Sequence, residues 1–205
     1  MKSNRSGNQI HAITNTNLVF VKLLPLDSAT RREINEFDYN SLPWIKTVYN
    51  HNTRFYNGGI KIITDEDWAG IQRPTYLDTI QQLIIDQWAV IDPNAQVRRP
   101  LRSILNLSES QGMTKADIHH DYTDHWTNQW SALVHLNDNT DGGTDFFTSL
   151  IFLDTVMTVP YVPGQVIIFP SVYAHQGQLP SVNPRLTANY IFEVDTQLNE
   201  QVYKQ

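Results

Sequence analysis

At 205 residues, with 40% hydrophobic and 18% charged residues, the chain fits one globular domain with a substantial core rather than a disordered polymer. Its 15 Lys and Arg against 21 Asp and Glu give a formal net charge of −6, which argues against a broad nucleic-acid-binding surface because phosphate binding needs clustered cations. The absence of Cys excludes disulfides and thiolate metal sites, so His, Asp and Glu remain as the strong metal ligands.

The first eleven residues are polar and lack the apolar run of a signal peptide. The stretch Leu18–Leu26 is apolar but short, and Lys22 interrupts it, so a buried strand explains it better than a membrane span. We therefore expect a cytoplasmic protein that has no membrane partner.

The first hundred residues mix short apolar runs with loops and predict one clear helix between Thr75 and Pro93. A second helix is indicated from Asp27 or Ser28 through Glu36, and the Asn- and Gly-rich segment Tyr49–Gly59 is typical of a loop. The apolar residues that recur at helical spacing in the first helix are Leu77, Ile80, Leu83, Ile84, Trp88 and Ile91.

From about Arg102 the pattern changes to short apolar runs separated by turns, of which Asn137–Gly143 and Pro163–Gly164 are the clearest. Repeated short strands without helices between them favour an antiparallel sandwich or barrel. We expect one domain, with a supporting region at 1–101, a core at 102–194 and a frayed polar tail at 195–205. The predicted strands are Ser103–Leu107, Trp130–Leu136, Val156–Val159, Gln165–Phe169 and Leu186–Val194.

His119 and Asp121 are separated by one residue, so on a strand their side chains would project to the same side and could share a metal ion, with His120 on the other face. His175, in a short loop after a predicted strand, is the best candidate for a third ligand. Two His and one carboxylate leave three metal positions open, which suits Fe(II) oxygenase chemistry. A lone His-x-Asp is often a surface pair without a role, so the metal interpretation depends on the residues downstream.

Arg185 and Thr187 begin the last apolar strand and share one of its faces. A guanidinium offers a planar pair of donors for a carboxylate, and the hydroxyl adds one more. Arg185 could instead cap the strand in solvent, but an Arg that enters so apolar a run needs a partner.

Taken in order, the motifs of the second half resemble the prolyl-4-hydroxylase-like branch of the 2-oxoglutarate/Fe(II) oxygenases. The resemblance spans roughly 102–194, and the first hundred residues carry no motif of the family. It rests on His119-x-Asp121, Gly142-Gly143-Thr144, Pro163-Gly164-x5-Pro170-Ser171 and His175-x9-Arg185-x-Thr187.

The resemblance implies a mainly β fold with flanking helices and a double-stranded β-helix (jelly-roll) core. It implies that Fe(II) is bound by His119, Asp121 and His175, and that the distal carboxylate of the co-substrate 2-oxoglutarate pairs with Arg185, helped by Thr187. The family often has a Tyr where this chain has His135, whose imidazole N–H could donate the same hydrogen bond. Ser131, four residues earlier on that strand face, is expected to line the same pocket.

The implied activity is a dioxygenase reaction that hydroxylates a C–H bond of a peptide or protein side chain, possibly prolyl, or of a small molecule. Two alternatives stay open, a non-catalytic jelly-roll binding module and a cupin-like metalloenzyme that does not use 2-oxoglutarate. Substrate choice would come from the first half of the chain and from loops such as Thr123–Gln129.

Overall fold

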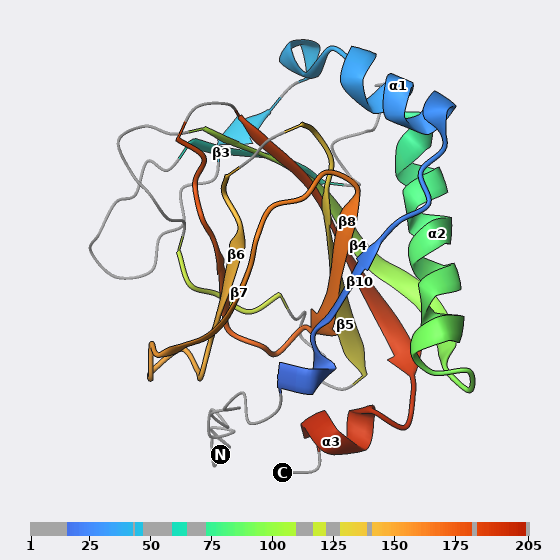
Figure 1. Ribbon diagram of the computed structural model, residues 1–205, viewed down its shortest axis with the longest axis vertical. Coiled ribbons are helices and arrows are strands. Elements are labelled where there is room, and N and C mark those ends of the chain that lie inside the picture. The colour runs from blue at the N-terminus through green and yellow to red at the C-terminus, as the bar shows by residue number, and fades with distance from the viewer. Residues whose placement is uncertain are drawn as a thin grey trace, which may run out of the picture.

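Ten strands in two antiparallel sheets form the core of the chain in a computed structural model (Figure 1). The structure describes residues 16–42, 44–46, 59–64, 73–109, 117–121, 128–138, 141–181 and 184–203. The large sheet has the order β1-β8-β5-β10-β4-β3-β2, and the small sheet has the order β7-β6-β9.

The strand predicted within Leu18–Leu26 is present as β1, but it is half-buried to exposed rather than buried, because it is an edge strand of the large sheet. The other five predicted strands are present as β4, β5, β7, β8 and β10. In the large sheet, the strands are β1 (Phe20–Leu23), β8 (Gln165–Pro170), β5 (Gln129–His135), β10 (Arg185–Asp195), β4 (Gln96–Glu109), β3 (Gly59–Thr64) and β2 (Ile45–Lys46). In the small sheet, they are β7 (Thr155–Val159), β6 (Thr144–Phe147) and β9 (His175–Gly177). The described part of the first hundred residues thus supplies β1, β2, β3 and the start of β4 as well as helices.

From β4 onward the chain winds between the two sheets. It passes from β4 to a bridge at His119 that pairs with β9, then to β5, to the β6–β7 hairpin, to β8, to β9 and finally to β10. This alternation is a double-stranded β-helix, so the predicted mainly β jelly-roll fold is confirmed.

Helix α2 (Thr75–Ile91) runs along the outer face of the large sheet, and α1 (Ser28–Glu36) lies across its end (Figure 1). The buried positions of α2 recur at helical spacing, and Trp88 meets Trp130 of β5 edge to face with ring centroids 4.9 Å apart. Asp27 caps α1 by accepting a hydrogen bond from the backbone N–H of Thr30 at 2.7 Å. Both predicted helices are confirmed, and they leave the inner face of the sheet to the small sheet.

The inner faces of the two sheets meet through aromatic side chains. Phe146 of β6 packs edge to face on Phe169 of β8 with centroids 5.0 Å apart. Period two on β10 and β5 turns Thr187 and Asn189 inward opposite His135 and Leu133. This inner face therefore carries polar side chains between the two sheets.

The tail predicted to fray instead contains a short helix, α3 (Asn199–Tyr203), which is docked on β5 and β10. The indole N–H of buried Trp130 donates to Asn199 Oδ1 at 2.8 Å, and Asn199 Nδ2 donates to the Val194 carbonyl oxygen at 2.8 Å. A buried indole needs an acceptor, and the polar tail provides one. The loop predicted at Tyr49–Gly59 lies outside the described residues, except for Gly59.

In the part of the chain that the structure describes, the helices are too short or too polar to cross a membrane.

Candidate active site

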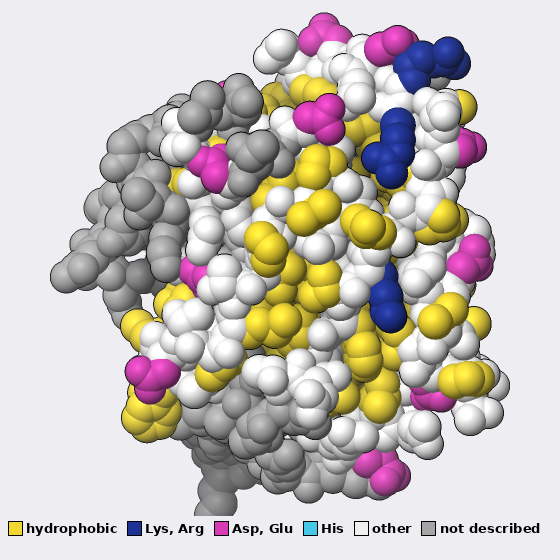
Figure 2. All heavy atoms as spheres, viewed as in Figure 1, with side chains coloured by type: hydrophobic (Ala, Val, Ile, Leu, Met, Phe, Trp, Pro, Cys, Tyr) yellow, Lys and Arg dark blue, Asp and Glu magenta, His cyan; other side chains and the backbone are white. Residues whose placement is uncertain are grey.

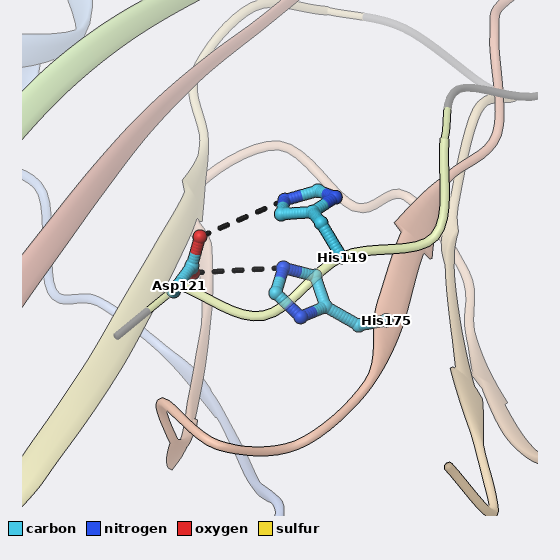
Figure 3. A group of neighbouring side chains, drawn as sticks. All are labelled: His119, Asp121 and His175. Atoms are coloured by element: carbon cyan, nitrogen blue, oxygen red, sulfur yellow. Dashed lines mark ion pairs between the residues drawn. The ribbon is translucent and has the colours of Figure 1, made fainter. Parts of the chain in front are cut away.

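The side chains of His119, Asp121 and His175 converge between the two sheets, with the carboxylate turned toward both imidazoles (Figure 3). Asp121 Oδ1 lies 3.6 Å from His119 Nε2, and Asp121 Oδ2 lies 3.5 Å from His175 Nε2. The three ligand atoms lie within 4.8 Å of one another. Ligands in neighbouring positions around a metal at roughly 2.1 Å are roughly 3 Å apart, so a small contraction would let all three bind one ion.

Backbone hydrogen bonds set this geometry. The N–H of His119 donates to the His175 carbonyl oxygen and the N–H of His175 donates to the His119 carbonyl oxygen, both at 3.0 Å. The N–H of Asp121 donates to the Ser171 carbonyl oxygen at 3.0 Å. His119 is in an isolated bridge rather than the predicted strand, because only this short segment pairs with β9. The expected arrangement of His119 and Asp121 on one side is nevertheless present.

Each imidazole is oriented by the carbonyl two residues before it. Nδ1 of His119 lies 2.9 Å from the Asp117 carbonyl oxygen, and Nδ1 of His175 lies 3.0 Å from the Tyr173 carbonyl oxygen. A carbonyl oxygen only accepts, so Nδ1 carries a proton in both rings, and Nε2 is the ring atom that faces the Asp121 carboxylate. A hydrogen bond that fixes the proton on Nδ1 leaves Nε2 as the atom that can bind a metal.

The electrostatics of the cluster favour a divalent cation. Burial by itself would raise the pKa of Asp121, but His175, His119 and Arg102 outweigh burial and hold that pKa below its usual range. Burial lowers the pKa of His175 to about 4, so this ring is neutral at physiological pH. For His119, burial opposes protonation, but the Asp121 carboxylate outweighs burial and raises the pKa of the ring. One carboxylate and two imidazole Nε2 atoms form a donor set that fits Fe(II) and related first-row ions.

Two further side chains hold the Asp121 carboxylate. Asn189 Nδ2 of β10 donates to Oδ2 at 2.9 Å, and Arg102 Nη2 of β4 lies 3.4 Å from Oδ1. Sequence reasoning missed both residues. The signal for Asn189 was present, since it is an amide in an otherwise apolar run and shares the face of Thr187.

Arg185 is buried at the start of β10, with 5% of its surface exposed. Its Nη2 donates to Thr144 Oγ1 at 3.2 Å, and the guanidinium carbon lies 5.9 Å from the centre of the Tyr161 ring. Among the described residues, its Nε has no hydrogen-bond partner and no carboxylate pairs with the guanidinium. Burial lowers the pKa of Arg185 to about 10, which leaves it charged at neutral pH. Among the described residues, none neutralises this buried cation.

His135 and Thr187 are adjacent across β5 and β10 near this cation. Burial lowers the pKa of His135 to about 3, and its Nδ1 accepts a hydrogen bond from the Val162 N–H at 3.2 Å. The neutral ring must then carry its proton on Nε2, a buried donor without a partner among the described residues. Thr187 Oγ1 is likewise buried without a partner in that part of the chain.

Ser131 faces the same interior, but its hydroxyl is 2.9 Å from the Ser171 hydroxyl. The Ser171 carbonyl oxygen in turn accepts the Asp121 N–H. Ser131 is thus hydrogen-bonded to the residue that supports Asp121. Its predicted contact with the co-substrate stays a prediction. The substrate loop expected at Thr123–Gln129 lies outside the described residues up to residue 127.

No family model matches this sequence, and no curated protein matches it either. Solved structures do match. A prolyl hydroxylase from Trichoplax adhaerens, in complex with a hypoxia inducible factor oxygen degradation domain peptide fragment, has a TM-score of 0.63 at 15% identity, over 93% of this chain and 87% of that chain. A Pseudomonas putida prolyl-4-hydroxylase has a TM-score of 0.57 at 19% identity, over 86% and 92%.

The non-heme alpha ketoglutarate dependent epimerase SnoN from nogalamycin biosynthesis has a TM-score of 0.61 at 13% identity, over 85% of this chain and 77% of that chain. These identities are low, so the likeness concerns the fold. The chain has the jelly-roll fold of the 2-oxoglutarate/Fe(II) oxygenases, and the resemblance expected from the sequence motifs is confirmed at that level.

Proposed function

We propose that the protein is an Fe(II)- and 2-oxoglutarate-dependent oxygenase that hydroxylates a C–H bond of a peptide or protein side chain, or of a small molecule. The observation that carries this proposal is the buried, unneutralised guanidinium of Arg185. It lies on the strand face that also presents Asn189 to the metal-ligand cluster.

A buried cation without a counterion destabilises a fold by on the order of several kcal/mol. An anionic ligand removes this penalty, and a carboxylate matches the two-pronged guanidinium best. Thr187 Oγ1 and His135 Nε2–H are further donors that lack partners among the described residues. Three unsatisfied polar groups in one buried region support a carboxylate-binding site rather than a packed core.

The spacing between this region and the metal ligands suits a dicarboxylate that bridges them. Arg185 and Asn189 are four residues apart on β10, which corresponds to about 13 Å between their Cα atoms. The Arg185 side chain spans part of that distance. A five-carbon ketoacid can therefore place one carboxylate on Arg185 and its other end at the metal.

In this proposal, His119, Asp121 and His175 hold the iron, and Asn189 holds the Asp121 carboxylate in place. Arg185, Thr187 and His135 bind the distal carboxylate of 2-oxoglutarate, and the aromatic walls Phe146 and Phe169 exclude water around His175. When bound, iron and 2-oxoglutarate together activate dioxygen for attack on an unactivated C–H bond. The overall conversion turns 2-oxoglutarate, dioxygen and R–H into succinate, carbon dioxide and R–OH.

Neither alternative accounts for all of these residues. A cupin-like enzyme that does not use 2-oxoglutarate would leave Arg185 buried without an anion. A non-catalytic module would not need two imidazoles whose Nε2 atoms converge on one carboxylate. These features favour the oxygenase.

The test is an anaerobic titration of metal-free protein with Fe(II) and then 2-oxoglutarate, followed by the visible charge-transfer absorption of the chelated ketoacid. Wild type should develop the band, His175→Ala should lose it, and Arg185→Gln should need far more 2-oxoglutarate to reach it. Arg98→Gln, at an exposed cross-strand ion pair with Asp195, is the matched control and should behave as wild type. Folded, metal-loaded wild type without a band would reject the proposal.

A further inference from the structure

The tip of the β6–β7 hairpin exposes four consecutive large hydrophobic side chains, which we call the apolar tip. Leu150, Ile151, Phe152 and Leu153 are 46%, 60%, 62% and 57% exposed. The other large exposed hydrophobic residues that the structure describes are scattered singly over other elements. Figure 2 shows hydrophobic side chains gathered at the lower left of the molecule, where the β6–β7 hairpin ends in Figure 1. A contiguous patch of this kind usually marks an interaction site.

The turn itself presents these side chains outward. Ser149 is buried, and its hydroxyl accepts hydrogen bonds from the N–H groups of Ile151 at 3.2 Å and Phe152 at 2.9 Å. The Ser149 N–H donates to the Phe152 carbonyl oxygen at 3.1 Å, and the Thr148 N–H donates to that of Asp154 at 3.0 Å. A turn closed by its own hydrogen bonds keeps the apolar side chains away from the core.

The apolar tip lies at the metal end of the jelly roll. Its strand β6 pairs with β9 so that Phe146 is opposite His175, and the Phe147 N–H donates to the Ala174 carbonyl oxygen at 3.0 Å. The hairpin points to the end where β5 begins and β8 ends (Figure 1). A molecule that rests on the tip is therefore close to the strand that carries the metal ligand His175.

The shape and charge of the hairpin favour one kind of occupant. The tip protrudes, whereas small molecules are bound in concave sites. No Lys or Arg occurs between Gln129 and Pro184, so this region lacks the cations that draw a protein to anionic lipid. Among the described strands, β7 pairs only with β6. An extended polypeptide can lay its backbone along the edge of β7 and place its side chains on the apolar tip.

We propose that the apolar tip docks a polypeptide substrate through aliphatic or aromatic side chains next to the residue that is oxidised. This assignment rests on the proposed oxygenase function and narrows its substrate from any C–H compound to a polypeptide segment. Val156 and Met157 of β7 are half-buried and pack against the core, which anchors the hairpin that carries the tip.

The experiment measures fluorescence polarisation of two pools of short labelled peptides, one rich in Leu, Ile and Phe and one in which Ser and Gln replace them. Wild type should bind the apolar pool, and the double variant Ile151→Ser/Phe152→Ser should bind it roughly tenfold or more weakly. Val90→Ser is the matched control, because Val90 is 67% exposed on α2 and remote from the hairpin. It should bind as wild type does.

Equal binding by the double variant, or no binding by wild type, overturns the proposal. So does tip-dependent binding to phosphatidylcholine vesicles, or tip-dependent self-association, without peptide binding. The change in melting temperature on adding Co(II) and 2-oxoglutarate tests the oxygenase proposal separately from the docking surface. If wild type shows no shift yet binds peptides through the tip, the oxygenase proposal fails and the docking surface stands. If wild type and the double variant both show the shift, and both bind the peptides equally, only the docking assignment fails.

Discussion

His119 and His175 hold each other by two backbone hydrogen bonds, each N–H donating to the other's carbonyl oxygen at 3.0 Å. The two residues are far apart in the sequence, and this bridge brings their ring centroids to 4.4 Å. Because the contact is made by the backbone, it does not depend on either imidazole. The metal-ligand geometry can therefore be perturbed one side chain at a time without removing the bridge that supports it.

The first prediction uses this independence. His175→Ala should keep the bridge and the fold while lowering Mn(II) or Co(II) affinity by well over about 100-fold, because one of three ligands is lost. Isothermal titration of metal-free protein measures the affinity, and circular dichroism checks the fold. His120→Ala, next to the ligands in sequence but outside the cluster, should change the affinity little. Comparable losses in both variants would contradict the proposed ligand set.

Asn189 offers a test of the support around Asp121. Asn189→Ala removes the amide that donates to Asp121 Oδ2 at 2.9 Å, so the carboxylate is less well oriented. We expect a loss of metal affinity of roughly 10- to 100-fold, the usual range for such supporting groups. The melting temperature of the metal-free protein should change much less than the affinity. A large drop in that temperature, with affinity preserved, would mean that Asn189 acts only in packing.

The sequence was informative where local spacing carries the chemistry. His119-x-Asp121 needs only one intervening residue, and periodic apolar runs predicted α1, α2 and five strands. It missed β2 and β3 in the first hundred residues, and it missed β6 and β9, which have four and three residues and begin with polar or ionisable side chains. Buried Asp145 of β6 is tolerated because Thr158 and Gln178 donate to it at 2.7 and 2.9 Å. Those partners are known only from the folded chain.

For the polar residues around the site as well, the sequence identified some candidates but not the contacts that they make. Arg185 was identified from its position at the head of a strand, but only the structure reveals that no described carboxylate pairs with it. Tyr161, which stacks on His135 with centroids 4.2 Å apart, carries no local signal because its neighbour is on another strand. Sequence patterns thus indicate which residues can act, and tertiary pairing decides which of them meet.

His135 should act as a hydrogen-bond donor to 2-oxoglutarate. Its Nδ1 is occupied by the Val162 N–H, so only Nε2–H is available. His135→Leu should weaken 2-oxoglutarate binding to the Co(II)-loaded protein by roughly tenfold or more, since the bond lost is to a charged group. His135→Gln, which keeps a donor amide, should recover part of that affinity. Equal affinity in all three proteins, by titration calorimetry, would remove His135 from the site.

The same residue predicts a pH dependence of stability. Burial lowers the pKa of His135 to about 3, whereas the unfolded chain should titrate near 6.5. Between these values the unfolded state binds a proton that the native state does not, so stability is full above about pH 6.5 and falls as the pH is lowered. His135→Gln should flatten this slope by up to about 1.4 kcal/mol per pH unit. Urea denaturation of both metal-free proteins from about pH 5 to pH 7 measures it, and parallel curves would contradict it.

The last prediction concerns Gly177 of β9, whose missing side chain leaves room for Arg185. A Cβ at this position would lie 3.0 Å from Arg185 Nη1, so Gly177→Ala should displace the guanidinium. Because Gly177 lies at the Arg185 end of the site, 2-oxoglutarate affinity should fall several-fold while metal affinity stays close to wild type. The measurement is a double-mutant cycle with Arg185→Gln, in which Gly177→Ala should have little further effect. If the two effects simply add, Gly177 acts on the co-substrate site by a route other than Arg185.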